Sequence, residues 1–256
     1  MNISESVNNK IKRMKPGKLF SYQDFSSYSD HSAAIIKAIS RHSKDLGLIK
    51  VKKGLYYKEA KGAFGSMAPK DSDVINYFSR NNNKTVGYIT GLALYHRWGL
   101  TTQIPAEITI ATSKNKREKI ELSGLRITTI PAPDKVTDNT IPLLQFLDIL
   151  KHVDRIPDTT TEDVIIKLVK RLTTYSPQQV ETMENIAIRS YSAKTKALLG
   201  SFLETYLNHF STKLHKTLNP TSSYKITVTN TLQIKQKHWH LNISRNSPQG
   251  MKNATS

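Results

Sequence analysis

Hydrogen-bond donors and cations are concentrated between residues 29 and 53 of this chain. They are Ser29, His31, Ser32, Lys37, Ser40, Arg41, Lys44, Lys50, Lys52 and Lys53. Hydroxyl, imidazole and amine groups can donate to the edges of nucleic-acid bases, and lysine and arginine pair with phosphate. The chemistry that these residues offer is therefore the binding of a polyanion rather than the making or breaking of bonds.

The elements that position these groups can be predicted from the spacing of apolar residues and from turn signals. Ile3, Val7 and Ile11 recur at helical spacing, and Ser21 with Asp24 has the spacing of a capping box. We expect, in order, a helix over 3–14, a short helix from Ser21, a turn over 26–30, a helix over 31–46 ended by Gly47, and a β-hairpin over 48–57 that reverses at Lys53-Gly54.

This order is typical of a winged helix-turn-helix, whose third helix enters the major groove of DNA while the hairpin, or wing, contacts phosphates. We assign base contacts to Ser29, His31, Ser32 and Lys37, backbone contacts to Arg41 and Lys44, and wing contacts to Lys50, Lys52 and Lys53, with Ser40 as a further donor on the helix. The alternative is a helical unit that docks on another protein, with solvated lysines.

The net charge of +18 favours a polyanionic partner, and it is unevenly spread. Residues 1–61 hold 13 Lys/Arg against 5 Asp/Glu, residues 62–208 hold 18 against 15, and residues 209–256 hold 7 against none. The chain has no cysteine, which excludes disulfides and thiol chemistry and fits a reducing compartment. No apolar run approaches the ~20 residues of a membrane-spanning helix, so we expect a cytoplasmic protein without membrane contact.

Beyond the first unit the pattern predicts a mixed α+β body over 71–211, joined by a linker over 61–70. Strands are expected over 107–112 and 125–130, with a charged loop or hairpin over 113–122 between them. The expected helices begin near residues 71, 91, 140, 160, 177 and 193, the last running to about 210. Residues 212–256 are expected to form a basic tail, either a hairpin or disordered. The fold class is thus α+β: a winged helix-turn-helix, a small sheet and a C-terminal helical bundle.

Residues able to perform catalysis or to bind a metal are few. His238 and His240 flank Trp239 without a nearby carboxylate to complete a zinc site, and Asp71 with Asp73 lies where a helix begins, as capping residues do. There is no glycine-rich phosphate loop. We therefore expect no cofactor, no metal and no enzymatic activity.

The chain resembles the AbiEi-type antitoxins of bacterial toxin-antitoxin pairs over about residues 1–210. The likeness is carried by residues 46–49, 53–56, 87–95, 98–105 and 107–112, of which Gly99 to Pro105 is the most specific. The resemblance implies an autorepressor that binds repeats in its own promoter and whose body counteracts a nucleotidyltransferase toxin, usually without a stable complex. His96 and Arg97 are the candidates for contact with a partner. The alternatives are a DNA-targeted nuclease or other DNA-processing protein, and a non-catalytic adaptor.

Overall fold

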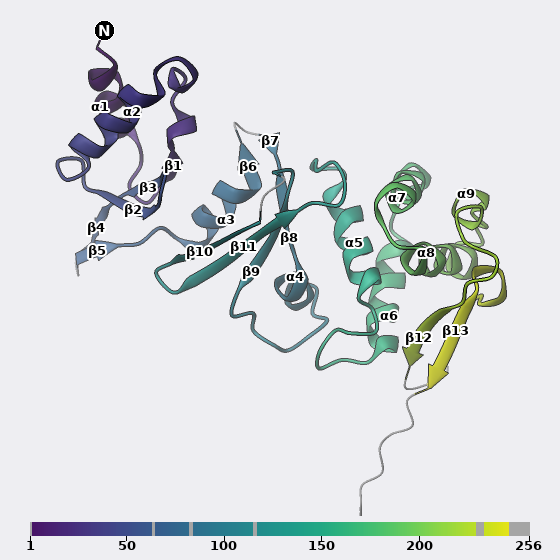
Figure 1. Cartoon of the computed structure of the whole chain (residues 1–256). Helices are drawn as coiled ribbons and strands as arrows, with labels where there is room; N and C mark the ends of the chain where they lie inside the picture. Colours follow the sequence, from purple (N-terminus) through teal and green to yellow (C-terminus); the bar gives the residue numbers. More distant parts are fainter. Residues whose placement is uncertain (1, 63–64, 82–83, 115–116, 229–232, 246–256) are drawn as a thin grey trace, which may run out of the picture.

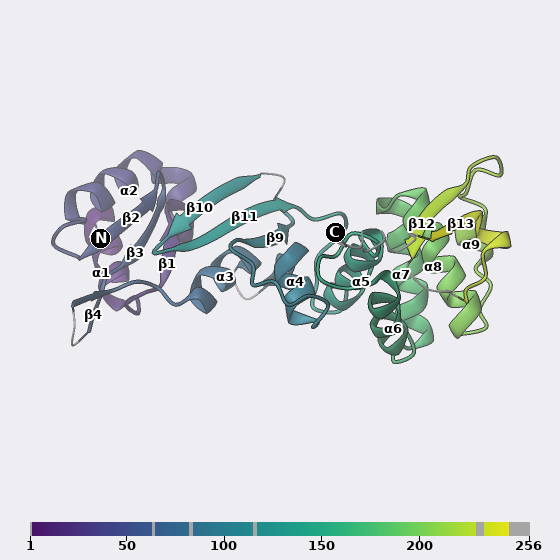
Figure 2. The same ribbon diagram turned by 90° about the horizontal axis from the view of Figure 1, so that it is seen from below.

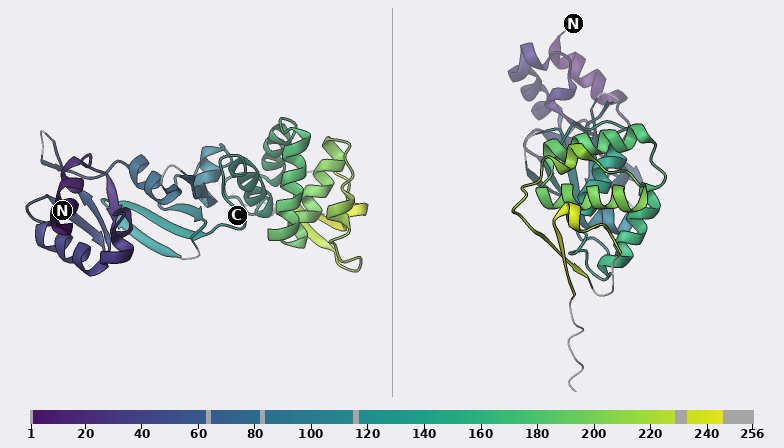
Figure 3. Two further views of the ribbon diagram at one scale, coloured as in Figure 1. Left: turned by 90° about the horizontal axis from the view of Figure 1, so that it is seen from above. Right: turned by 90° about the vertical axis from the view of Figure 1, so that its right-hand side faces the viewer.

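A computed structural model describes residues 2–62, 65–81, 84–114, 117–228 and 233–245. The protein is a mixed α+β structure (Figure 1). It is elongated, with three units in a row (Figures 2 and 3). We call them the headpiece (residues 2–58), the central unit (71–131) and the helical unit (141–245). Within the described residues, none of the helices has the length and apolarity required to cross a bilayer.

The headpiece contains helices and a three-stranded antiparallel sheet of order β1-β3-β2. Its elements are α1 (Ile3–Arg13), β1 (Leu19–Ser21), the 3-10 turn η1 (Tyr22–Asp24), α2 (Tyr28–His42), β2 (Leu48–Lys52) and β3 (Leu55–Lys58). Val7 and Ile11 of α1 pack with Ile35 and Ile39 of α2 in a core of its own. The predicted order of helices and the predicted hairpin are therefore present.

The bounds of α2 differ from the predicted 31–46. The helix begins at Tyr28, inside the expected turn, and His31 breaks its regularity with φ −134° and ψ 38°. It ends at His42, so Leu46 lies in a following turn, where the N–H of Leu48 donates to the carbonyl of Ser43 at 2.8 Å. Gly47 has the left-handed φ of +59° expected of a residue in such a reversal.

The predicted linker over 61–70 is partly regular. Strands β4 (Ala60–Gly62) and β5 (Gly65–Met67) pair antiparallel before the chain enters the central unit. The linker is thus a short hairpin rather than an irregular segment.

The central unit is built on a four-stranded sheet of order β10-β11-β9-β8. Its elements are α3 (Asp71–Ser79), β6 (Arg80–Asn81), β7 (Lys84–Thr85), β8 (Gly87–Thr90), α4 (Gly91–Arg97), β9 (Ile108–Thr112), β10 (Glu118–Leu122) and β11 (Leu125–Pro131). Helices α3 and α4 cover one face of the sheet (Figure 2), and Ile89, Ile110 and Ile127 are buried in the protein's larger core.

The pairing within this sheet was not predictable from the order of its strands. The segment 113–122, predicted as a charged loop or hairpin, contains strand β10, which pairs with β11 through Ser123-Gly124, whose φ values are +51° and +85°. Strand β11 then runs parallel to β9. Two adjacent residues with positive φ make the tight β10–β11 turn more favourable than the longer charged loop.

The helical unit follows in α5 (Ile141–Lys151), α6 (Thr161–Leu172), α7 (Pro177–Ser190), α8 (Ala193–Tyr206) and α9 (Thr212–His215). The starts follow the predicted caps: the side chain of Thr160 accepts from the N–H of Asp163, and Ser176 forms a capping box with Gln179. Helix α8 ends before the expected residue 210, since Asn208 adopts a left-handed φ of +51°.

The segment after residue 211 is not a detached tail. Strands β12 (Tyr224–Val228) and β13 (Leu241–Arg245) pair in parallel, with the 3-10 turn η2 (Lys237–Trp239) between them. A hairpin would have been antiparallel, so that prediction is wrong. Trp239 is fully buried against Gly200 of α8. The segment between the two strands therefore packs on α8, and β13 runs parallel to β12. Residues 246–256 of the predicted tail lie outside the described part of the chain.

Candidate nucleic-acid interface

Seven of the predicted donors and cations are exposed on α2 and in the turn that follows it. These are Ser29, His31, Ser32, Lys37, Ser40, Arg41 and Lys44. They face outward because Ile35, Ala38 and Ile39 occupy the stripe that packs on α1. Within the described part of the chain, no hydrogen bond or ion pair engages any of these side chains. We call this surface the α2 face.

Other cations of the headpiece have structural roles. The ammonium of Lys10 donates to the carbonyl of Asp24 and lies 5.0 Å from the centre of the Phe25 ring, which fixes η1 against α1. Lys58 donates to the carbonyl of Lys12 at 2.9 Å. These contacts separate cations that hold the headpiece together from cations that remain available on the α2 face.

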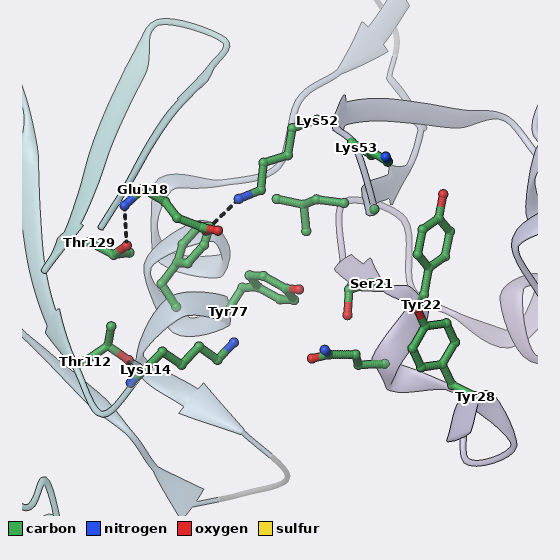
Figure 4. Close-up of a pocket in the computed structure, with 14 residues that line it drawn as sticks. Ser21, Tyr22, Tyr28, Lys52, Lys53, Tyr77, Thr112, Lys114, Glu118 and Thr129 are labelled. Atoms are coloured by element: carbon green, nitrogen blue, oxygen red, sulfur yellow. Dashed lines mark hydrogen bonds and ion pairs between the residues drawn. The ribbon is translucent and has the colours of Figure 1, made fainter. Parts of the chain in front are cut away.

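The three lysines of the hairpin are in different surroundings. Lys50 is exposed on β2 and Lys53 is exposed at the tip, whereas the ammonium of Lys52 lies 2.6 Å from a carboxylate oxygen of Glu118 on β10 (Figure 4). The predicted phosphate contacts of the three lysines remain predictions, and Lys52 would have to leave Glu118 to make its contact. The hairpin tip packs beside the central sheet, where Lys52 finds a carboxylate distant in the sequence.

A cavity of about 410 Å³ separates the hairpin from the central sheet. Tyr22, Tyr28, Lys53, Tyr77 and Lys114 are among the residues that line it (Figure 4). The hydroxyls of Tyr22 and Tyr56 lie 2.9 Å apart. Burial and this hydrogen bond raise the pKa of Tyr22 to about 12. No local sequence pattern predicts this cavity, because its walls come from both units.

His96 and Arg97, the predicted partner residues, are exposed at the end of α4. Arg97 also lines a hollow of about 430 Å³ with Trp98, Lys167 and Arg171. The guanidinium of Arg171 lies 4.2 Å from the centre of the Trp98 ring, and Lys167 donates to the carbonyl of Gly99. The two α6 cations could not be associated with α4 from the sequence. The residues that line the hollow belong to the central and helical units.

The residues weighed for metal binding or catalysis have other contacts. His238 Nδ1 lies 3.0 Å from Glu204, whose other carboxylate oxygen accepts from the Trp239 indole at 2.7 Å. Asp71 and Asp73 lie in the first turn of α3. Among the described residues, no three His, Cys, Asp or Glu side chains converge as a metal site would require.

Residues 6–179 match the model of a family of unknown function, DUF6088. The chain belongs to this family. The DUF6088 match begins in α1 and ends at the start of α7, so it includes the whole α2 face, the central sheet and the hollow beside Trp98. No curated protein matches the sequence.

Proposed function

We propose that this DUF6088 protein is a DNA-binding transcriptional repressor of the AbiEi antitoxin type, and that its headpiece acts as a winged helix-turn-helix. The observation that carries the proposal is the α2 face, a row of exposed donors and cations that have no partner within the described chain. An excess of 13 Lys/Arg over 5 Asp/Glu in residues 1–61 supports a polyanionic partner.

In this proposal α2 enters the major groove with its amino-terminal part foremost. Ser29, His31 and Ser32 lie around the irregularity at His31 and would reach base edges with Lys37. Ser40 and Arg41 lie near the end of α2 and Lys44 lies in the turn after it, where they would contact the sugar-phosphate backbone. The side chains that select a sequence would thus precede those that supply general affinity.

The role of the wing is reduced to Lys50 and Lys53, because Lys52 is paired with Glu118. The packing of the hairpin on β10 instead orients the headpiece relative to the central unit. Leu19, Leu55 and Tyr57 of the headpiece also contribute to the larger core, so full-length variants are a better test than a fragment of about sixty residues.

The antitoxin part of the proposal is supported by the resemblance and by the basic hollow around Trp98. Arg97, Lys167 and Arg171 place three cations beside one aromatic ring, with no acidic residue among the lining side chains. Such a surface suits an acidic partner, and contact with a nucleotidyltransferase toxin would use it together with His96.

A charge reversal on the α2 face tests DNA binding. In Arg41→Glu with Lys44→Glu, two proposed contacts with DNA phosphates become repulsive. Affinity for every duplex should therefore fall by about 100-fold or more, and the dependence of binding on salt should weaken. Binding would be measured by fluorescence anisotropy, using a duplex from upstream of the protein's own gene and a scrambled duplex at several salt concentrations.

The matched control is Lys225→Glu with Lys237→Glu, which reverses two exposed lysines of the helical unit. It has the same net charge as the test variant and should bind nearly as tightly as the wild type. Equal losses in both variants would mean that only net charge matters, and the α2 face would lose its assigned role.

Co-expression tests the antitoxin part separately. If a neighbouring gene encodes a nucleotidyltransferase-like protein that arrests growth, the wild type should restore growth. The Arg41→Glu, Lys44→Glu variant, supplied from an unrelated promoter, should restore it as well. Failure of the wild type to restore growth would remove the antitoxin assignment and leave DNA binding untouched.

A further inference from the structure

A hollow of about 370 Å³ lies where the open face of the central sheet meets α5 and the residues after α7. This volume is within the range of small-molecule sites. The lining comes from several elements: Thr90 and Thr109 from the sheet, Arg117 before β10, and Asp148, Lys151 and His152 from α5 and its end. Neither the proposed DNA contact nor the hollow beside Trp98 uses these residues.

The floor of this hollow is the half-buried side chain of Asp148. One oxygen accepts from Tyr88 at 2.9 Å and from Thr90 at 2.7 Å, and the other accepts from Tyr191 at 2.8 Å. A carboxylate offers about four acceptor positions, so three donors leave about one open. Burial raises the pKa of Asp148 against the lowering effect of these hydrogen bonds and of Lys151. Asp148 is held rigidly, with capacity for one more donor.

The rim of the hollow is cationic. Arg117 and Lys151 are both exposed, and neither forms an ion pair within the described residues. His152 Nδ1 lies 3.0 Å from the carbonyl oxygen of Asp148, which can only accept, so Nε2 is left available. Asp148 is the only acidic residue among the described lining side chains. An arginine and a lysine beside hydroxyl groups are suited to a phosphate.

One wall of the hollow is largely apolar. Tyr95, Ile130, Pro131 and Pro133 contribute to it. Proline and aromatic rings present rigid surfaces on which the body of a ligand can lie without ordering flexible side chains. The hollow therefore combines an anion site at its rim, an apolar wall and a hydrogen-bond acceptor at its floor.

We propose that this hollow binds a sugar phosphate, either free or as part of a mononucleotide, with its phosphate on Arg117 and Lys151 and a sugar hydroxyl donating to Asp148. The site goes beyond the proposed repressor function and does not depend on it. A protein that fails to bind DNA can still bind this ligand.

Isothermal titration of the full-length protein with four probes tests the site. Ribose 5-phosphate and AMP carry both groups, whereas ribose and inorganic phosphate carry one each. At least one of the first two should bind about tenfold or more tightly than either of the last two, because only they engage rim and floor together. Comparison of AMP with ribose 5-phosphate distinguishes a nucleotide from a free sugar phosphate. No heat from either at millimolar concentration, or equal binding of inorganic phosphate, would overturn the proposal.

Variants locate the binding. Arg117→Gln with Lys151→Gln should weaken the better ligand by about tenfold or more, since two charge-assisted contacts are lost. Lys119→Gln is the matched control: Lys119 is an exposed cation on β10 that does not line the hollow, and its loss should leave binding unchanged. These positions are exposed, so folding should be preserved. Wild-type affinity in the double variant would place the ligand elsewhere and sink the assignment.

Discussion

The α2 face and the helical unit differ in whether their polar side chains have hydrogen-bond or ion-pair partners. In the helical unit, Glu204 accepts from the indole of Trp239, and the carboxylate of Glu184 lies 3.1 Å from His209. On the α2 face, seven polar or charged side chains lie exposed, and within the described residues none has a partner. A polar group that is already bonded stabilises the fold, whereas an exposed unpaired group is available to bind another molecule.

The hairpin shows that this contrast does not follow from residue type. Lys50, Lys52 and Lys53 lie within four residues of one another, yet Lys52 alone is paired with an acid of the central unit. A lysine is a good candidate for a phosphate contact only when no carboxylate of the protein is paired with it. Five substitutions test this contrast.

The largest effect is expected for Trp239→Ala in the helical unit. Trp239 is fully buried, and its ring fills the space beside Gly200. Its loss should lower the free energy of unfolding by about 3–5 kcal/mol, because a large cavity replaces an aromatic side chain. Urea denaturation followed by circular dichroism would measure this. A loss below about 1 kcal/mol would show that the C-terminal segment is not part of the core.

A smaller loss is expected for Asp134→Asn, which removes a half-buried charge that is paired with Arg189. Burial raises the pKa of Asp134, but hydrogen bonds from Arg189, Lys135 and Ser190 outweigh it and leave the pKa below its ordinary value. A carboxyl group whose pKa is lowered by folding stabilises the folded state at any pH above its pKa in the unfolded chain. This stabilisation is lost as the pH falls through the pKa of the folded state. The variant should be about 2 kcal/mol less stable at neutral pH. Urea titrations across pH should converge with the wild type in acid, and a constant difference would contradict the assignment.

A change in selectivity is expected for Lys37→Ala on the α2 face. If Lys37 contacts a base, its loss should cost about 1–2 kcal/mol on the preferred duplex and less on a scrambled one. Competition binding with both duplexes separates the two. The free energy of unfolding should change by less than about 0.5 kcal/mol, because the side chain is exposed and unpaired. An equal loss on both duplexes would make Lys37 a backbone contact.

The smallest effects are expected in the hairpin. Lys52→Gln should cost less than about 1 kcal/mol of stability, since the Lys52–Glu118 pair is partly exposed, and should leave the salt dependence of DNA binding unchanged. Lys50→Ala should leave the stability unchanged and should reduce the slope of log affinity against log salt by about one. If the slope changes in Lys52→Gln as well, the ion pair does not persist in the DNA complex.

Most of the helices and strands could be predicted from short sequence patterns alone. Helix α4 begins and ends at the predicted Gly91 and Arg97, and the caps at Thr160 and Ser176 begin α6 and α7. Lys53-Gly54 reverses the predicted hairpin, where Gly54 has φ +81°. Each feature depends on contacts within about four residues, so the sequence contains its whole cause. The exposure of the α2 face belongs here too, because helical periodicity decides which positions face outward.

Contacts between distant residues were decided by the tertiary structure alone. Three contacts join segments that no local pattern relates. They are the parallel pairing of β9 with β11, the burial of Trp239, and the ion pair between Lys52 and Glu118. The cluster around Asp148 draws hydroxyls from β8 and from the residue after α7. Such contacts depend on how whole elements pack, because many residues share the free energy of packing and none of them specifies a partner by itself.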